Sequence, residues 1–287
     1  MNALRKAELA RGATLYVTLE PCSTHGRTPP CVDAIVRAGL ARVVIGAIDP
    51  NPKHAGRGVK LLLKAGIEVA TGVIENECTT LNRAFNKWIV TGMPWVIAKA
   101  GMSLDGRLTR PPGEGQWITN AKSRADAMLL RARVDAILIG AQTLRADNPK
   151  LTVRGIKGAR QPWRIVLTRS DRLPKAAHLF TDAQRGRTLV YRKQSLRAVL
   201  RDLGKKRITS VLIEGGGEVL GDAFDRRLVD EVHFYIAPLL CGGPDVIGGR
   251  GAQRSADSVS LKDVRYERLG DDLHLSGLTN PTAPSVV

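Results

Sequence analysis

Two cysteines flank the segment PCSTHGRTPPC (21–31), in which a proline pair stands directly before the second cysteine. Proline is favoured in the first turn of a helix, so we expect Cys31 just inside a helix and Cys22 on the loop before it. A helix N-terminus lowers the pKa of a thiol and favours zinc binding, and a catalytic Zn²⁺ needs three protein ligands and one open position. A pair of buried thiols on a tight loop is the alternative, and the spacing alone leaves both open.

Three consecutive glycines interrupt SVLIEGGGEVLG (210–221) between a buried-strand pattern and a helix pattern. Without side chains, such a loop lets backbone N–H groups and the helix N-terminus approach a phosphate. The spacing is not the GxGxxG pattern of a Rossmann domain, which is therefore not implied. A plain strand-to-helix turn is the alternative, and the run of three glycines favours phosphate contact over it.

The elements around the cysteine loop alternate between strands and helices. Strands are expected in ATLYVTLEPC, RVVIGAIDPNP and the end of GVKLLLKAGIEVATGV, and helices in PPCVDAIVRAGL and the start of GVKLLLKAGIEVATGV. This rhythm predicts a mostly parallel sheet covered by helices. A helix and a linker over residues 77–94 then lead to a domain boundary at Met93–Pro94.

Beyond that boundary the pattern is again α/β. A helix that feeds a buried strand is expected in SRADAMLLRARVDAILIG, and further strands in WVIAKAGMSLDG, WRIVLT, TLVYR, SVLIEGG, EVHFYIAPLL and DDLHLSGL. We therefore expect two α/β domains, residues 1–93 and 94–280, followed by a tail over 281–287.

The composition of the 287 residues limits the classes of function. A net charge of +17 and a pI near 10.3 suggest nucleic-acid binding, but the basic residues are spread along the chain and only four Trp, four Tyr and four Phe are present. An arginine-rich solvated surface or anionic small ligands explain the charge better. No apolar run is long enough for a membrane span and the first residues lack a secretory pattern, so we expect a cytoplasmic protein with reduced cysteines.

The cysteine loop resembles that of the zinc-dependent deaminase domain of riboflavin biosynthesis, and DPNPKHAGRG (49–58) resembles its substrate loop. The resemblance implies a cytidine-deaminase-like three-layer domain in which Cys22 and Cys31 bind Zn²⁺. In that family a His-Ala-Glu triplet supplies the third zinc ligand and the proton-shuttling glutamate. The triplet would fall immediately before residue 1, so we expect a truncated domain, an incomplete zinc site and no deamination.

Two interpretations of that truncation stay open. The domain is a degenerate remnant, or the start codon is misassigned. Met1 stands where the family usually has valine, and a GUG codon can be misread as an initiator, so we favour the second. His25 lies on the loop that faces the substrate in the family, and we do not expect it to replace the missing ligand.

The rest of the chain resembles the reductase domain that accompanies this deaminase, an α/β domain with a fold similar to dihydrofolate reductase. The resemblance rests on the ordered segments AKAGMSLDGRL (98–108), GEGQWIT (113–119), LLRARVDAILIGAQTLRADNPKLTVR (129–154) and IEGGGEVLG (213–221). It implies NADPH contacts at Gly101, Trp117, Thr143, Asp147, Gly215, Gly216, Gly217, Glu218, Val219, Leu220 and Gly221. It implies substrate contacts at Gly115, Arg131, Leu151, Arg154 and Glu214.

Some of these residue types fit the implied chemistry without the resemblance. Guanidinium groups bind a sugar phosphate bidentately, as Arg131 and Arg154 would. Asp147 is the one candidate for a polar catalytic organiser. The family usually has an Asp-Ser pair where this chain has Thr168-Arg169, and Arg169 is a candidate for the 2′-phosphate of NADPH that the sequence leaves undecided.

The resemblance implies an NADPH-dependent reduction of 5-amino-6-(5-phosphoribosylamino)uracil to its ribitylamino product. The cofactor carries the hydride chemistry and no protein nucleophile is needed. Two alternatives remain, a bifunctional deaminase/reductase encoded by a longer frame and a non-catalytic or nucleic-acid-binding protein. The expected partners are the phosphorylated pyrimidine and further copies of the chain, which the family joins through the reductase domain.

Overall fold

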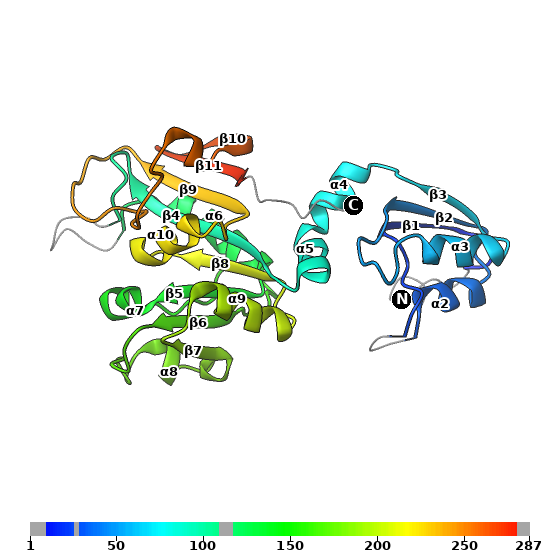
Figure 1. Ribbon diagram of the computed structural model, residues 1–287, viewed down its shortest axis with the longest axis horizontal. Helices are drawn as coiled ribbons and strands as arrows, with labels where there is room; N and C mark the ends of the chain where they lie inside the picture. The colour runs from blue at the N-terminus through cyan, green and yellow to red at the C-terminus, as the bar shows by residue number, and fades with distance from the viewer. Residues whose placement is uncertain (1–9, 26–28, 109–116, 280–287) are drawn as a thin grey trace. The chain divides into compact units, whose positions relative to one another are not determined.

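The computed structural model describes residues 10–25, 29–108 and 117–279. The chain divides into two compact units, Met1–Met93 and Pro94–Val287, which Figure 1 shows. The tail expected over 281–287 lies outside the described residues. In the part of the chain that is described, no helix has the length and apolar character that crossing a bilayer requires.

The first unit contains a parallel sheet of three strands in the order β1 (Thr14–Leu19), β2 (Arg42–Ala47) and β3 (Glu68–Thr71). Its helices are α2 (Cys31–Arg37), α3 (Arg57–Lys64), α4 (Glu75–Leu81) and α5 (Arg83–Thr91). In place of the one helix and linker expected over 77–94, two helices meet at Asn82, and the second ends at Thr91.

The middle strand β2 explains the layering of this unit. Val43 and Ile45 pack with α2 and α3 on one face of the sheet. Gly46 points to the other face, where a side chain would collide with Cys78 of α4. Since successive residues of a strand face opposite sides, β2 is buried on both faces and the unit has three layers, as expected (Figure 1).

Directly after β1, the buried carboxylate of Glu20 gathers the loop over 49–58. Its Oε2 accepts hydrogen bonds from the backbone N–H groups of Asp49 (3.2 Å) and Gly56 (2.9 Å). Its Oε1 accepts from Gly58 (2.8 Å) and Val59 (3.2 Å) in the first turn of α3. The four N–H groups come from both ends of the loop, so the Glu20 carboxylate holds the two ends together. Because the carboxylate is buried, water cannot replace any of these hydrogen bonds, and breaking one is unfavourable.

The second unit is built on eight strands in the order β10-β11-β9-β4-β8-β5-β6-β7. Six of them are parallel: β4 (Trp95–Ser103), β5 (Ala136–Gly140), β6 (Trp163–Thr168), β7 (Thr188–Arg192), β8 (Ser210–Glu214) and β9 (Glu231–Ala237). Two antiparallel strands, β11 (Asp272–Thr279) and β10 (Leu261–Leu269), extend one edge. The sequence did not indicate β10, which is largely exposed and lacks an apolar alternation.

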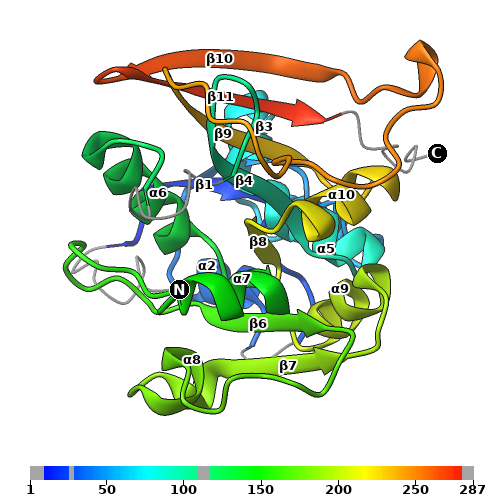
Figure 2. The same ribbon diagram turned by 90° about the vertical axis from the view of Figure 1, so that its left-hand side faces the viewer.

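Helices cover both faces of this sheet (Figure 2). The helices α6 (Ala121–Arg133) and α7 (Ala141–Asp147) pack through Leu130 and Leu144 against Ile97, Ile137 and Leu212. The remaining helices are the short α8 (His178–Thr181), α9 (Leu196–Lys205) and α10 (Gly217–Asp225), with 3₁₀ turns at Arg185–Arg187 and Ser255–Asp257.

We predict that Glu20→Gln loosens the 49–58 loop while the sheet of the first unit stays folded. The amide replaces one acceptor oxygen by an N–H₂ group that faces N–H donors, which destabilises the loop by about 1–3 kcal/mol. Hydrogen exchange of the amides of residues 49–59 should rise at least tenfold. Glu68→Gln, on the exposed edge strand β3, is the matched control. Equal protection in the two variants would contradict a holding role for Glu20.

Candidate active site

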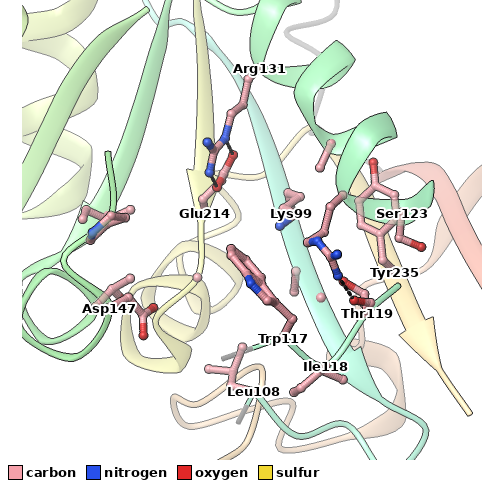
Figure 3. A pocket seen from close by; sticks show the side chains of 18 of the residues that line it. Lys99, Leu108, Trp117, Ile118, Thr119, Ser123, Arg131, Asp147, Glu214 and Tyr235 are labelled. Carbon is pink, nitrogen blue, oxygen red and sulfur yellow. Dashed lines mark hydrogen bonds and ion pairs between the residues drawn. The ribbon is translucent and has the colours of Figure 1, made fainter. Parts of the chain in front are cut away.

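A cavity of about 180 Å³ lies between the sheet of the second unit and its helices α6 and α7. Figure 3 shows the side chains that line it. Polar and charged groups come from several elements: Lys99 of β4, Arg131 of α6, Asp147 of α7, Glu214 of β8 and Tyr235 of β9. The cavity thus lies where several strands of a mostly parallel sheet meet the helices that cover it, a common place for a ligand.

Strand geometry places the charges of this cavity beside one another. Ile97 of β4 and Leu212 of β8 both belong to the core under α6 and α7. Two residues further along each strand, on the same face, stand Lys99 and Glu214, which are paired across the sheet. On these two neighbouring strands, the apolar core pair is therefore followed, two residues later on the same face, by a pair made of a lysine and a glutamate.

Arg131 forms a bidentate ion pair with Glu214. Its Nε and Nη2 donate to the two carboxylate oxygens at 2.6 Å each, and its Nη1 donates to the carbonyl of Thr152 at 3.2 Å. Burial opposes the ionisation of Glu214, but the charges of Arg131 and Lys99 outweigh it and lower the pKa of the carboxyl. The pair is almost closed to solvent, with side-chain exposures of 12% and 8%, and these bonds use three of the five guanidinium N–H groups.

Lys99 is the cation of this cavity that stays available. Among the described residues it has neither a hydrogen bond nor an ion pair, and its Nζ lies 5.8 Å from the centre of the Tyr235 ring. Burial lowers the pKa of Lys99; Glu214 counters that shift and Arg131 adds to it. A lysine in this environment can release its proton nearer neutral pH than an exposed lysine does.

Tyr235 is fixed from behind the cavity. Its hydroxyl donates to Asp126 of α6 at 2.6 Å, and its ring stacks on His274 with centroids 4.5 Å apart. Burial and the Asp126 carboxylate raise the pKa of the phenol, so Tyr235 stays neutral at any physiological pH. The face of the ring, not the hydroxyl, is therefore what the tyrosine presents to Lys99.

The glycines after β8 serve two purposes. Gly215 and Gly216 have φ of +71° and +81°, a region that residues with side chains rarely adopt. A side chain at Gly216 would also lie 3.0 Å from the Thr143 hydroxyl. Gly217 and Gly221 instead allow α10 to contact the backbone of Asp245 and Gly248, where any side chain would collide. Only the first two glycines thus leave backbone open toward α7.

A second cavity of about 550 Å³ adjoins the first at Thr143, which lines both. It lies beyond Gly216, over the carboxyl ends of β6 and β7, where the backbone N–H of Lys193 donates to the carbonyl of Thr168 at 2.8 Å. Arg169 and Lys193 project here from the two adjacent strand ends. Neither has an ion pair among the described residues, whereas Arg226, in the same cavity, is paired with Asp222.

The structure gathers most of the residues expected to bind ligands. Eight line the first cavity: Gly101, Trp117, Arg131, Thr143, Asp147, Leu151, Glu214 and Gly215. Gly216, Glu218, Val219 and Arg169 line the second. Gly217, Leu220, Gly221 and the exposed Arg154 line neither cavity, and Gly115 lies outside the described residues.

Trp117 and Asp147, which both line the first cavity, have environments unlike those of an ordinary core or surface residue. Trp117 is 54% exposed at the cavity mouth, with its ring centre 5.3 Å from the Arg124 guanidinium, and is not a core aromatic. Partial burial raises the pKa of the Asp147 carboxyl, which faces the cavity from the end of α7 (Figure 3). Asp147 is thus easier to protonate than an exposed aspartate.

Sequence reasoning missed Lys99, Tyr235 and Arg124. A signal for Lys99 was present, because a lysine in the middle of the apolar strand WVIAKAGMS has no structural reason to be there. Tyr235 alternates with buried residues in EVHFYIA and looks like an ordinary strand aromatic. Only the packing of α6 reveals that its hydroxyl is held and its ring faces a cavity.

The two cysteines of the first unit lie close together, with the backbone N–H of Cys31 3.3 Å from Cys22 Sγ. Burial and the neighbouring Cys22 thiol raise the pKa of Cys31. His54 bonds to Ser23 and Thr24, and His25 is exposed. Within residues 10–25, 29–108 and 117–279, no three His, Cys, Asp or Glu side chains form a metal site. The described residues thus supply two ligands and do not complete a zinc site.

Known proteins match both units. Residues 94–275 match the family model of the RibD C-terminal domain, and residues 1–47 match that of the cytidine and deoxycytidylate deaminase zinc-binding region. The riboflavin biosynthesis protein RibD of Escherichia coli is 40% identical over 317 residues, with 96% of this chain and 86% of the relative covered. RibD of Bacillus amyloliquefaciens is 38% identical over 297 residues, with 94% and 80% covered.

Solved structures agree with these matches. RibD of Acinetobacter baumannii has a TM-score of 0.84 at 36% identity, with 96% of this chain and 84% of that chain covered. A deaminase/reductase of Thermotoga maritima has a TM-score of 0.82 at 33% identity, with 97% and 82% covered. The expected fold class, a deaminase-like unit followed by a reductase-type α/β unit, is confirmed. The chain therefore belongs to the RibD family of riboflavin biosynthesis proteins.

Proposed function

We propose that the second unit reduces 5-amino-6-(5-phosphoribosylamino)uracil to its ribitylamino product with NADPH. The Thermotoga maritima relative is described as such a reductase joined to a deaminase. The observation that carries the proposal is the pair of adjoining cavities that meet at Thr143 and the Gly215-Gly216 turn. One cavity holds a buried cation beside an ion pair, and the other is larger and is lined by Arg169 and Lys193 at the strand ends.

The second cavity suits the phosphates and adenosine half of a dinucleotide. Gly215 and Gly216 present backbone with no side chain in the way, and the N-terminus of α10 follows at once. Arg169 and Lys193, at the far end, suit the 2′-phosphate that distinguishes NADPH from NADH. Thr143, which lines both cavities, would then contact the cofactor between its phosphates and its nicotinamide. When bound there, NADPH supplies the hydride for the reduction.

The protein's own residues supply the proton and the geometry. Reduction of the ring-opened sugar adds a hydride to its imine-like carbon and a proton to the attached nitrogen. A proton donor is therefore needed beside the substrate. Lys99 Nζ has the freedom and the lowered pKa for that transfer. Asp147, on α7 at the opposite wall, is the second candidate donor, because its pKa is raised. The Arg131–Glu214 pair fixes the wall between β8 and the loop that follows α7.

For the first unit we propose that the 287 residues do not deaminate. Residues 1–93 contain two histidines, His25 and His54, and neither lies with Cys22 and Cys31 in a three-ligand cluster of described residues. Without a third ligand and a glutamate beside it, a bound water has neither the metal nor the base that this chemistry needs. The bifunctional alternative requires ligands that residues 10–25 and 29–93 do not provide.

The direct test is turnover by the purified 287-residue chain. With the deaminated pyrimidine substrate, NADPH absorbance should fall with enzyme-dependent kinetics. With the aminated precursor, ammonia should not appear above background, and zinc should stay well below one ion per chain. A folded chain that neither binds nor oxidises NADPH would refute the reductase, and zinc-dependent ammonia release would refute the statement about the first unit.

Removing the cavity lysine should stop the chemistry without releasing the cofactor. We expect Lys99→Met to lower kcat by about 10²-fold or more, the usual contribution of a positioned proton donor. Because burial lowers the pKa of Lys99, the wild-type rate should fall on the alkaline side at a pH below the ordinary lysine range. Lys122→Met, on the exposed start of α6, is the matched control. A Lys99→Met enzyme within threefold of wild type would exclude Lys99 as the donor.

The two cations at the strand ends should set the cofactor preference. Arg169→Ala and Lys193→Ala should each raise KM for NADPH by roughly tenfold and leave KM for NADH unchanged, since an exposed ion pair with a phosphate contributes on the order of 1 kcal/mol. Arg201→Ala, on the exposed face of α9, is the charge-matched control. Equal effects on NADPH and NADH would place the 2′-phosphate elsewhere.

A further inference from the structure

Arg164 is a charged residue inside the apolar core of the second unit. It lies on β6 next to Ile165 and Val166 and is 1% exposed. Taking a guanidinium out of water is unfavourable, and a buried ion pair is often no more stabilising than apolar residues of the same volume. Arg164 lines neither of the two cavities, so direct ligand contact does not account for it.

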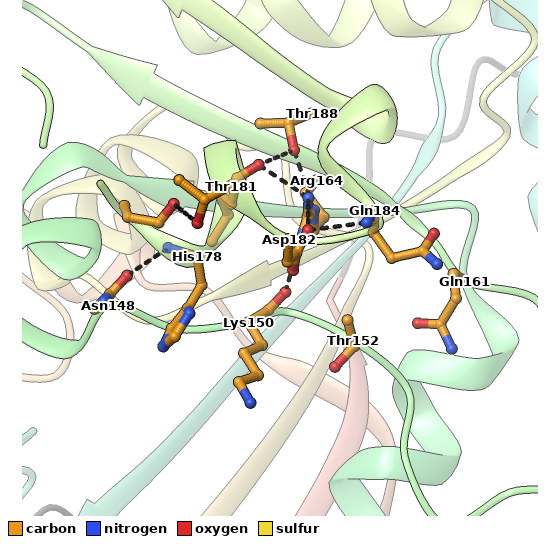
Figure 4. Close-up of polar contacts among 12 residues, drawn as sticks. Asn148, Lys150, Thr152, Gln161, Arg164, His178, Thr181, Asp182, Gln184 and Thr188 are labelled. Carbon is orange, nitrogen blue, oxygen red and sulfur yellow. Dashed lines mark hydrogen bonds and ion pairs between the residues drawn. The ribbon is translucent and has the colours of Figure 1, made fainter. Parts of the chain in front are cut away.

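Every N–H group of this guanidinium has a partner, as Figure 4 shows. Nη1 and Nη2 donate to the two carboxylate oxygens of Asp182 at 2.7 and 2.9 Å. Nε donates to the Thr188 hydroxyl at 3.1 Å, and Nη2 also to the Leu179 carbonyl at 2.9 Å. The fifth bond runs from Nη1 to the carbonyl of Lys150 at 3.1 Å. The hydrogen bonds from Arg164 lower the pKa of Asp182, so the pair is ionised at neutral pH.

The Lys150 carbonyl belongs to the loop that follows α7 and forms a wall of the first cavity. Pro149 and Leu151, on either side of Lys150, line that cavity, as does Asp147 at the end of α7. Leu151 has φ of +50°, a region that leucine rarely adopts, so the loop is held in a conformation that this residue does not favour. Asn148, with φ of +40°, caps the C-terminus of α7, where asparagine tolerates this region. Partners outside the loop must therefore fix it.

Three such partners hold the loop at alternate residues. The backbone N–H of His178 donates to Asn148 Oδ1 at 2.9 Å, Arg164 holds the carbonyl of Lys150, and Arg131 holds the carbonyl of Thr152. The first two come from the α8 side, because Asp182 directly follows α8 and orients Arg164 (Figure 4). The third comes from the active-site ion pair itself. The loop thus lies between a buried remote ion pair and the Arg131–Glu214 pair.

We propose that Arg164, oriented by Asp182, is a positioning residue that sets the Asp147–Leu151 wall of the reductase cavity through the Lys150 carbonyl. The proposal rests on the proposed function. On this account, Arg164 is charged and buried in β6 because it fixes the loop that lines the reductase cavity. Methionine or leucine would fill the space at Arg164 but would leave the carbonyl of Lys150 without its donor, while the carbonyl of Leu179 would keep the hydrogen bond from the Thr188 hydroxyl.

The test compares Arg164→Lys and Arg164→Met with a core variant of equal stability cost. Lysine keeps the charge opposite Asp182 but cannot reach Asp182 and both carbonyls at once, so kcat/KM for the pyrimidine should fall about tenfold for lysine and further for methionine. The fall should appear mainly in KM for the pyrimidine, with the Kd for NADPH within twofold of wild type. Val199→Ala, in the buried face of α9, is the control for lost stability alone.

Two further measurements keep the outcome decisive. If Arg164→Met does not fold, Asn148→Ala removes the His178 contact at the other fixed point and should raise the same KM. Hydrogen exchange of residues 148–153 should quicken in the Arg164 and Asn148 variants and not in Val199→Ala. Unchanged exchange, or a KM in Val199→Ala equal to that in Arg164→Lys, would overturn the positioning role. A wild-type chain that oxidises no NADPH would refute the function, while the exchange result still decides the role of Arg164.

Discussion

Three ionisable side chains withdrawn from water at one level of the sheet determine the rest of the site. Lys99 and Glu214 are cross-strand partners on β4 and β8, and Arg131 reaches both from α6. Arg131 and Lys99 contribute two positive charges and Glu214 one negative charge, and Arg124 and Asp147 also line this cavity of about 180 Å³. Since burying an unpaired charge is unfavourable, burial lowers the pKa of Lys99, which has no ion pair among the described residues.

Backbone groups around the cavity also need hydrogen-bond partners, and this explains how the loop after α7 is held. The loop after α7 has two left-handed residues and no ladder of its own, so it depends on Arg131 inside the site and on Arg164 behind it. Of the glycines after β8, Gly215 and Gly216 leave space beside Thr143. Gly217 and Gly221 instead allow the backbone of α10 to pack against another backbone segment. A run that looks uniform in the sequence therefore belongs partly to the cavity and partly to the core.

The first unit uses the same principle with a different chemistry. Glu20 gathers four backbone N–H groups from the 49–58 loop, in the way that Arg164 gathers carbonyls in the second unit. In each case a buried charge fixes a loop by holding backbone groups of that loop. Cys22 and Cys31 approach one another on the loop after β1, but the described residues around them do not complete a metal site.

The sequence by itself determined the alternation of strands and helices, the glycine turn after β8 and the family motifs, because these depend on short-range periodicity and local backbone preference. Most of the ligand-binding residues that it indicated line one of the two cavities. It did not reveal Lys99 and Tyr235, because their neighbours come from other strands and from α6. Nor did it separate Gly216 from Gly221, place Arg154 outside the cavity, or find β10, whose edge position needs no apolar alternation. Only the tertiary structure decides which side chains are buried beside one another. That shared burial shifts the pKa values of Lys99, Arg131 and Glu214.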